Sequence, residues 1–461
     1  MAEPNIPETA AKPPSPLREL IDPFINLAKA PRALWAVNLA YLLEGLCYFG
    51  ILTLLGLFFN DYAKLDDVHA GWILSAFTGG ITLAMFFFGE LADRWGVRAA
   101  LLLSLLLMVV GRVLLTSSPF FGGSGMFSPV MLAAVGGLLL VVIGYGMFQP
   151  AAYAAVRMFT NEKTAPMGYA MLYGLMNLGG FMSGIMSPPI RGSFGITGIY
   201  WVYAAITAAG LVAVFILLTK GAAQKAKEGA SGVDAKVTAQ GIPMEAIKAP
   251  FHLLTWLKTH PLADLKFSFF IFALIPVQTL FAHQWMTMPQ YVARAYPGWV
   301  SNHMETFVNL NALLIFVLTP IVTALTSKVK VYRMMVLGTL VMALPTFFLV
   351  IGPHIVPLFA YIIFLSIGEA MWSPRFYQLA AEIAPEGKTG QYMGIAQFPW
   401  FLTKMLTGLY SGAMLRAYCP ADAPQNTEML WLIYGCIALA TPLGLWLARN
   451  WMGNRLQKSG H

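Results

Sequence analysis

Residues 33–59 read ALWAVNLAYLLEGLCYFGILTLLGLFF, a continuous apolar run that contains one charged residue, Glu44. An α-helix needs roughly 20 apolar residues to cross the hydrocarbon core of a bilayer. The run therefore predicts a membrane-spanning helix with a carboxyl group near its midpoint. Whether the chain is built from such helices depends on how often the pattern recurs.

Runs of the same kind recur along the whole chain of 461 residues, in two groups of six. The predicted spans are 33–59, 69–92, 98–117, 129–157, 167–190, 197–219, 266–293, 303–326, 331–353, 356–383, 389–415 and 426–452. We therefore predict an all-α integral membrane protein with twelve transmembrane helices in two six-helix bundles.

This division predicts a simple domain order. Residues 1–30 form a flexible cytoplasmic tail, 31–219 the first bundle, 220–265 a cytoplasmic linker, 266–452 the second bundle and 453–461 a second cytoplasmic tail. Within the linker, 243–262 is amphipathic and is expected either to lie along the membrane surface or only to connect the bundles.

The composition supports lipid as the solvent, since 58% of the residues are apolar and 11% are charged. A soluble domain carries about 25% charged residues. The net charge of +8 comes from Lys and Arg that gather at the tails, the linker and one set of loops. Such an excess marks the cytoplasmic side, so we expect both termini there, no binding of nucleic acid, and a multi-pass protein of a bacterial inner membrane.

Catalytic and metal-binding signals do not appear in the sequence. Cys47, Cys419 and Cys436 have no paired spacing, so neither a disulfide framework nor a metal site is expected. We find no P-loop, HExxH or GxSxG motif. The sequence therefore predicts that the protein is not an enzyme and uses no cofactor.

Charged residues that lie away from the ends of the predicted spans are the acids Glu44 and Glu369 and the bases Arg112 and Lys404. A charge at the bilayer centre costs at least about 2.5–3.5 kcal/mol, so such residues usually mark a substrate or proton path. Two alternatives remain open at this stage. The charges form buried pairs that only fix packing, or Arg112 extends outward to the membrane surface.

Polar groups also lie near the middle of the first, fourth, seventh and tenth spans. They are Tyr41, Glu44 and Tyr48 on one helix face, then Gln149, then Gln278, His283 and Gln284, and finally Glu369, Trp372 and Ser373. Secondary transporters bind substrate between two such bundles. The pattern therefore predicts a wet central cavity, with aromatic side chains available to stack on a ligand.

Residues 89–98, GELADRWGVR, resemble the G-x-L-A-D-R-x-G-R loop of the major facilitator superfamily. Physically, Asp93 would accept hydrogen bonds from helix amides or pair with a neighbouring Arg. The resemblance implies the fold of that superfamily and a gating role for the motif residues Gly89, Asp93, Arg94, Gly96 and Arg98.

Further segments resemble the proton-dependent oligopeptide transporter family. They are LYGLMNLGG at 172–180, NALLIFVLTP at 311–320 and GEAMWSP at 368–374. The resemblance implies inward symport of a peptide-like substrate with protons, and it places Glu369 opposite the amino end of that substrate. It also adds Tyr173, Asn177 and Asn311 to the candidate substrate-binding residues.

The chain departs from that family's pattern where the family carries its cations. Gly45 replaces the arginine of the first helix, and Gln149 replaces the lysine of the fourth. Lys404 stands where the family usually has asparagine. Two readings of Lys404 stay open: it supplies a relocated positive charge for the substrate, or it pairs with Glu369.

The leading hypothesis is a proton-coupled symporter of a small peptide-like or zwitterionic solute, working by alternating access as a monomer. Glu44, Glu369 and His283 are the candidate proton-coupling residues. One alternative is a carrier of the same fold for a non-peptide organic anion or amphiphile, without coupling. Another is a receptor or scaffold that does not transport.

Overall fold

The computed structural model of the chain describes residues 31–88, 95–160, 165–230, 260–326, 329–385 and 392–456, apart from positions 393, 394 and 397. In that part of the chain every regular element is a helix. Gly89, Asp93 and Arg94 of the predicted gate lie outside the described residues, as does most of the predicted amphipathic segment 243–262.

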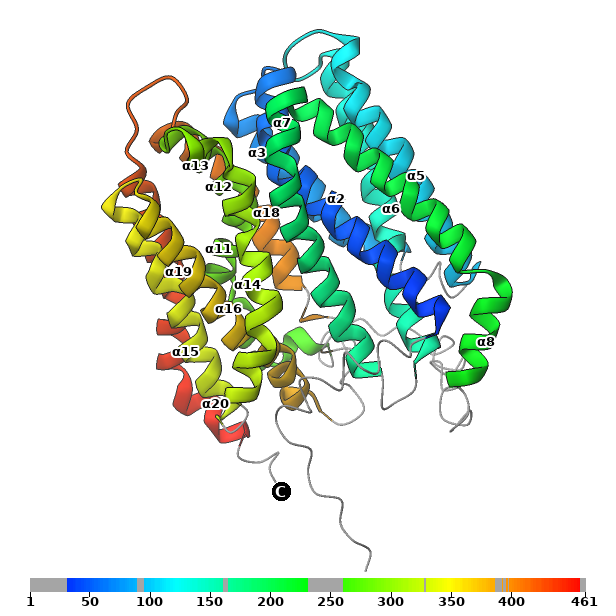
Figure 1. The fold of residues 1–461 in the computed structure, drawn as a ribbon. Coiled ribbons are helices and arrows are strands. Elements are labelled where there is room, and N and C mark those ends of the chain that lie inside the picture. Colours follow the sequence, from blue (N-terminus) through cyan, green and yellow to red (C-terminus); the bar gives the residue numbers. More distant parts are fainter. Residues whose placement is uncertain are drawn as a thin grey trace, which may run out of the picture.

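The first half of the chain contains five long helices. They are α2 (Arg32–Tyr62), α3 (Asp67–Phe88), α5 (Val97–Ser117), α6 (Pro129–Phe159) and α7 (Ala165–Leu217), with the short η1 (Ser118–Phe121) after α5 and α8 (Lys220–Ala230) at the end. The backbone of α7 breaks at Gly195, where φ is 70°. Because glycine alone adopts that angle without strain, the chain turns back there and α7 forms two antiparallel segments, as Figure 1 shows.

The second half is more interrupted. Its seventh span is divided into α10 (Leu265–Phe272), α11 (Ile275–Met286) and α12 (Met288–Ala295), with prolines at the starts of α11 and α12. Proline has no amide hydrogen and breaks the helix ladder. The other elements are η3 (Pro261–Ala263), α13 (Trp299–Asn302), α14 (Met304–Leu325), α15 (Val331–Ala343), η4 (Leu344–Ile351), α16 (Ile355–Ile383), α18 (Phe398–Tyr418), α19 (Thr427–Leu447) and α20 (Arg449–Leu456).

Within the described residues, ten helices are long and apolar enough to cross a membrane. One of these covers both segments of α7, and the more polar α18 is a further long helix of 21 residues beside them. Counting α7 as two spans and adding α18 gives the twelve helices that the sequence predicts. The all-α, two-bundle prediction is therefore confirmed, while the side of the membrane on which the termini lie stays a prediction.

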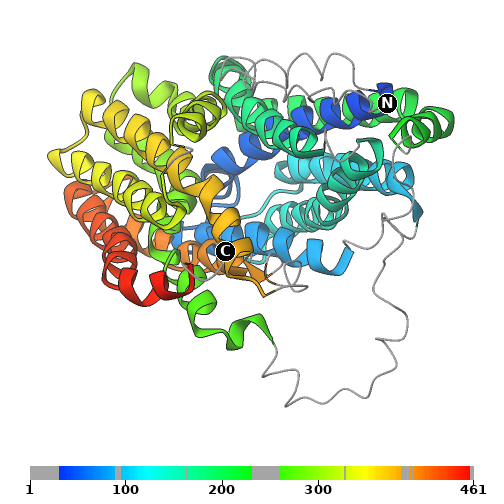
Figure 2. The ribbon, with the colours of Figure 1, turned by 90° about the horizontal axis from the view of Figure 1, so that it is seen from below.

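The two halves lie side by side (Figures 1 and 2) and meet mainly through α3 against α18 and α7 against α14. Glycines bring these backbones close together. A Cβ atom at Gly412 would lie 2.0 Å from the carbonyl oxygen of Asp67, and one at Gly408 would lie 2.4 Å from Ser75. Such small residues are typical of helix contacts in membranes.

The end of the molecule that carries α8 and α20 is called the terminal end, and the opposite end, with loops 63–66 and 419–426, the distal end (Figure 1). Among the described residues, all ion pairs between the halves lie at the distal end. Arg294 donates to both oxygens of Asp67 at 2.6 Å, Arg191 pairs with Glu305, and Arg416 lies 3.5 Å from Asp66. The structure is therefore held shut at the distal end.

Asp66 belongs to the distal loop, outside the spans, and also accepts hydrogen bonds from the backbone amide and the ring of His69. Partial burial opposes its ionisation. The hydrogen bonds from His69 and the charge of Arg416 outweigh that effect and hold the pKa of Asp66 below its usual value.

Candidate functional site

The carboxylate of Glu44 is paired with Arg112 inside the first bundle. Both side chains are 1% exposed, and the two Nη atoms of Arg112 donate to the two oxygens of Glu44 at 2.8 and 2.7 Å. Thr207, on the second segment of α7, also contacts Arg112, and Tyr145 donates to the Glu44 carbonyl at 3.1 Å. The pair thus ties α2 to α5 and α7.

This geometry corrects two expectations. Arg112 does not extend outward to the membrane surface, because its guanidinium is buried against Glu44. Glu44 also does not face a central chamber in this structure, since both of its oxygens are taken up by Arg112. Its role in proton coupling stays a prediction, with less geometric support than a carboxyl group that has no cation beside it.

The tyrosines predicted to share a face with Glu44 pack against α6 instead. Tyr41 is 3% exposed, and its ring stacks on Phe148 at 5.8 Å. The half-buried ring of Tyr48 lies 5.0 Å from that of Tyr145. The structure therefore directs the carboxylate of Glu44 toward α5 and the two tyrosine rings toward α6.

Glu369 on α16 is the buried carboxyl group of the second bundle. It is 4% exposed and accepts a hydrogen bond from Nδ2 of Asn311 on α14 at 3.1 Å. Asn311 donates also to Ser366 at 3.0 Å. No Lys, Arg or His of the described chain forms an ion pair with Glu369, so its negative charge has no compensating partner there.

Lys404 is the corresponding uncompensated cation, since the half-buried side chain has no hydrogen bond or ion pair within the described residues. Its neighbour Thr403 donates to Gln278 of α11 at 3.1 Å, while Met405 lies against Gly79 of α3. A helix turns about 100° per residue. On the helix surface, Lys404 lies between Thr403, which faces α11, and Met405, which faces α3. Its side chain therefore points into the interface between the halves.

A pair of stacked indoles puts Glu369 and Lys404 at a similar depth. The rings of Trp372 and Trp400 lie 6.1 Å apart at 15°. Glu369 is one turn before Trp372 on α16, and Lys404 is one turn after Trp400 on α18. The two helices run in opposite directions, so both residues lie one turn closer to the distal end than the indole pair. The alternative in which Lys404 pairs with Glu369 is not seen in this structure.

His283 on α11 lies in the interior of the second bundle. It is fully buried, its two ring nitrogens lie 2.8 Å from the hydroxyl of Thr287 and 2.9 Å from that of Tyr410, and its ring stacks on Tyr434 at 3.7 Å. Within the described residues, no hydrogen bond or ion pair joins His283 to Glu369. The structure therefore groups His283 with hydroxyl side chains of α18 and α19.

The other predicted substrate residues are scattered. Trp372 is buried and donates to the sulfur of Met342 at 3.1 Å, and Gln278 is buried beside Thr403. Asn177 donates to the backbone of Tyr173, whose side chain is 43% exposed. Gln149 and Ser373 are half-buried with no hydrogen bond in the described part of the chain.

The described gate residues stabilise the terminal end of the first bundle. Gly96 has φ 82° directly before α5. Arg98 donates from Nε to the carbonyl oxygen of Leu218 at 2.7 Å, and its guanidinium lies 5.4 Å from the ring centre of Phe215. Arg98 thus satisfies a carbonyl at the end of α7, within one half of the molecule.

Two features of the interface were missed by the sequence reading. One is the set of ion pairs at the distal end. The presence of Arg191, Arg294 and Arg416 in the outer loops could have indicated them. The other is an aromatic contact across the halves, with Phe49 stacked on Trp285 at 5.2 Å. Nothing in the spacing of single aromatic residues marks which of them face the other bundle.

The family model of the Major Facilitator Superfamily matches residues 37–408. The chain belongs to this superfamily. It is accordingly a multi-pass membrane protein with the superfamily's two-bundle architecture.

One relative is named a peptide transporter. The chain is 28% identical to the peptide transporter YePEPT of Yersinia enterocolitica over 165 residues, which are 34% of this chain and 31% of that relative. The aligned region thus spans about a third of the relative.

Solved structures agree on the fold. A peptide transporter POT in complex with sulfate superposes with a TM-score of 0.72 at 18% identity, over 92% of this chain and 96% of the other. A POT family transporter in complex with 5-aminolevulinic acid gives 0.67 at 18% identity, over 92% and 97%. The chain has the fold of these proteins, and the resemblance to the POT family is confirmed.

Proposed function

We propose that the protein is a secondary active transporter of a bacterial inner membrane that carries a small peptide-like or zwitterionic solute together with protons. The observation that carries the proposal is the pair of uncompensated charges, Glu369 and Lys404, at similar depth in the second bundle. The names of the relatives above, among them peptide transporters, support it.

The two charges match the two ends of a zwitterion. An ammonium group would bind Glu369 and a carboxylate would bind Lys404, and each contact would be a charge-assisted hydrogen bond. Each charge costs at least about 2.5–3.5 kcal/mol at the centre of a bilayer when unpaired. A bound zwitterion therefore offsets both costs at once, whereas a neutral solute offsets neither.

Proton coupling is assigned first to Glu369, which would take up a proton at one face of the membrane and release it at the other. Glu44 and His283 are further candidates with less geometric support, because Arg112 neutralises the first and hydroxyl groups enclose the second. Alternating access would follow from rocking of the two halves. The closed distal end would correspond to the state that is open toward the terminal end.

The test is uptake of radiolabelled dialanine into vesicles that contain the purified protein, with and without an imposed proton gradient. We expect Glu369→Gln to lose gradient-driven uptake and, at a dialanine concentration raised to offset the weaker binding of the ammonium group, to keep exchange of dialanine across the membrane. Glu228→Gln, which changes an acid on α8, is the matched control and should behave like the unmodified protein. Uptake that ignores the gradient, or driven uptake that survives Glu369→Gln, would overturn the proposal.

A carrier of non-peptide organic anions is the second candidate. It is favoured by Lys404, a cation that no carboxylate compensates in the described chain, and by the neutral Gln149 on α6. Competition separates the two candidates. Di- and tripeptides should block uptake by a peptide carrier, whereas a carrier of simple organic anions should ignore them and respond to small carboxylates instead.

A further inference from the structure

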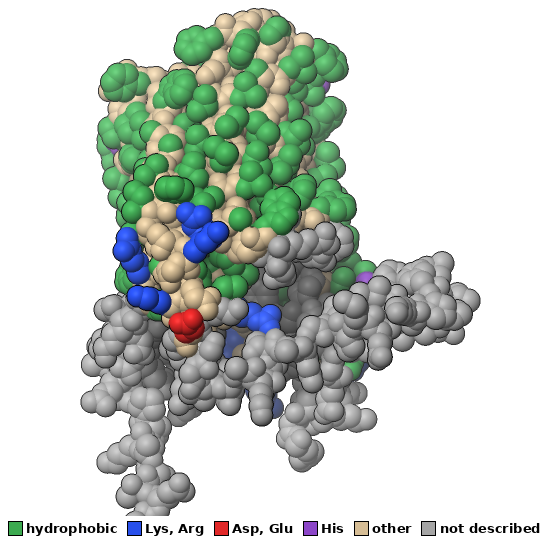
Figure 3. All heavy atoms as spheres, turned by 90° about the vertical axis from the view of Figure 1, so that its right-hand side faces the viewer, with side chains coloured by type: hydrophobic (Ala, Val, Ile, Leu, Met, Phe, Trp, Pro, Cys, Tyr) green, Lys and Arg blue, Asp and Glu red, His purple; other side chains and the backbone are tan. Residues whose placement is uncertain are grey.

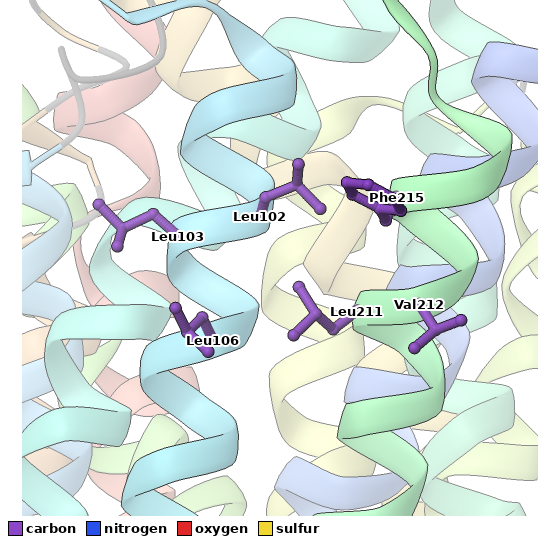
Figure 4. A pocket seen from close by; sticks show the side chains of 6 residues that line it. All are labelled: Leu102, Leu103, Leu106, Leu211, Val212 and Phe215. Carbon is purple, nitrogen blue, oxygen red and sulfur yellow. The ribbon is translucent and has the colours of Figure 1, made fainter.

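A groove runs along the lipid-facing surface between α5 and the second segment of α7. Its volume is about 360 Å³. Six hydrocarbon side chains from the two helices line it: Leu102, Leu103, Leu106, Leu211, Val212 and Phe215. Leu102 and Phe215 point toward one another across it, while Leu103 and Val212 lie at its outer edges (Figure 4). Leu102 and Leu106 on α5 are four residues apart, as are Leu211 and Phe215 on α7, so each of these pairs lies on one face of its helix.

The groove opens to the surrounding lipid. Leu106, Val212 and Phe215 are 47%, 54% and 61% exposed. A convex helix surface gives a lipid chain contacts on one side only, whereas a groove between two helices gives contacts on two sides. Dispersion contacts are individually weak but add up along a chain, so one acyl chain should be held longer here than elsewhere.

A fixed cation lies at the terminal end of the groove. Arg98 is one turn before Leu102 on α5, and its guanidinium lies 5.4 Å from the ring centre of Phe215, which lines the groove. Bonds from Nε to the carbonyl oxygen of Leu218 and from Nη2 to that of Phe215, at 2.7 and 3.5 Å, hold the group in place and leave Nη1 without a partner among the described residues. No carboxylate pairs with Arg98 in the part of the chain that the structure describes.

More positive charge surrounds this position. Lys220 follows Leu218 by two residues, and a second hollow next to Thr219 is lined by Arg32 and Lys225. The acid of α8, Glu228, accepts a hydrogen bond from Gln224 at 2.8 Å. Figure 3 shows the arrangement from the side: a hydrophobic face ends in Lys and Arg side chains at the terminal end.

We propose that this groove and Arg98 form a binding site for an anionic glycerophospholipid of the bilayer. One acyl chain lies along the six hydrocarbon side chains, and the phosphate accepts hydrogen bonds from the Nη atoms of Arg98. A negative headgroup is favoured because each Lys or Arg near a membrane surface attracts it by about 1 kcal/mol. A choline headgroup would bring its own cation among the basic side chains.

The bound lipid would brace α5, which carries Arg112 of the buried pair, against α7. Arg112 and Thr207 both lie further from the terminal end than the groove residues, and these two residues are in contact. A lipid that joins α5 to α7 at the terminal end therefore stabilises the same helix pair from outside. This role does not depend on which solute the protein carries.

The experiment uses the full-length protein in vesicles of dioleoyl phosphatidylglycerol and dioleoyl phosphatidylcholine mixed equally, followed by mild detergent extraction and native mass spectrometry. We expect phosphatidylglycerol to be retained over phosphatidylcholine, and Arg98→Gln to reduce that preference roughly fivefold, which corresponds to the loss of one interfacial charge. Arg333→Gln, at another exposed basic residue, should leave it unchanged.

A second variant tests the groove without touching the cation. Val212→Trp fills the groove and should lower retention of phosphatidylglycerol, while Leu139→Trp, at a 58% exposed position of α6, should not. Equal retention of the two lipids by the unmodified protein would overturn the proposal. So would a preference that survives Arg98→Gln, or retention that is unaffected by Val212→Trp.

Discussion

The two bundles treat their buried charges in opposite ways. In the first, Glu44 and Arg112 form a bidentate pair that is closed off from the rest of the molecule. In the second, Glu369 has an amide as its partner and Lys404 has none in the described chain. A paired charge fixes packing, while an uncompensated charge needs something from outside to bind. We therefore assign scaffolding to the first bundle and recognition of charge to the second.

The largest effect should come from breaking the pair in the first bundle. Arg112→Leu leaves Glu44 buried without its cation, which costs about 3–5 kcal/mol. For a bundle of this size that should lower the midpoint of thermal unfolding in detergent by roughly 10 °C. Replacing both partners, as in Glu44→Leu with Arg112→Met, should restore most of the loss. A shift of less than 2 °C (roughly half a kcal/mol) in Arg112→Leu would contradict the scaffolding role.

The next largest effect concerns Glu369. Glu369→Gln keeps the shape and the hydrogen bond to Asn311 but cannot carry a proton. We expect gradient-driven uptake to fall by about a hundredfold, the scale of a general acid–base contribution, while exchange without a gradient persists. Parallel assays of driven uptake and exchange in the same vesicles would show this, and equal loss of both would indicate a structural defect.

Lys404→Gln should change affinity and leave coupling intact. Hydrogen bonds to charged groups contribute about 1.5–3 kcal/mol, so the half-saturating concentration of dialanine should rise at least about tenfold. Alanine amide, which lacks the carboxylate, should bind the two proteins alike. The comparison tests whether Lys404 binds the carboxylate of the substrate, because weaker binding of both compounds would instead indicate that Lys404 only stabilises the packing of the helices.

A smaller effect is expected at the distal end, where Arg294 pairs with Asp67 across the halves. Both groups are about a tenth exposed, and removing one of them with Arg294→Gln should weaken closure by roughly 1–2 kcal/mol. Spin labels on α3 and α12 would report this as a larger population with the distal ends apart. The double change Asp67→Arg with Arg294→Asp should bring the ends together again.

The smallest effect is expected at Asp66, which is 39% exposed. Exposed ion pairs contribute less than about 1 kcal/mol. Because the pKa of Asp66 is lowered in the folded protein, its contribution is present above the unfolded value of about 3.9 and disappears as the pH falls through the folded one. Thermal unfolding of Asp66→Asn should therefore differ slightly from that of the parent protein at pH 6, and the difference should shrink as the pH falls below about 4.

The arrangement of helices was readable from the sequence because lipid imposes a simple requirement, a long apolar run for each span. The twelve predicted spans agree with the structure except at details such as the break of the seventh span into α10, α11 and α12. Those breaks follow from Pro276 and Pro289, since a proline interrupts the hydrogen bonds of a helix. Whether a membrane helix can accept such an interruption depends on the neighbouring helices, which satisfy the freed backbone groups.

The partners of the buried charges were not readable in the same way. Glu44 and Arg112 are 68 residues apart, and only the packing of both α2 and α5 against α7 brings them together. Helix periodicity placed Tyr41, Glu44 and Tyr48 on one side of a helix but could not say which helix that side meets. Likewise, nothing in the sequence ranked the two readings of Lys404, which the structure shows without a carboxylate partner.

The most direct test of this contrast compares gradient-driven uptake by two variants in identical vesicles. The double variant Glu44→Leu with Arg112→Met removes the paired charges of the first bundle, and Glu369→Gln removes the uncompensated carboxyl group of the second. The account predicts that the double variant still accumulates dialanine against its gradient and that Glu369→Gln does not. Accumulation by Glu369→Gln, together with its loss in the double variant, would contradict it.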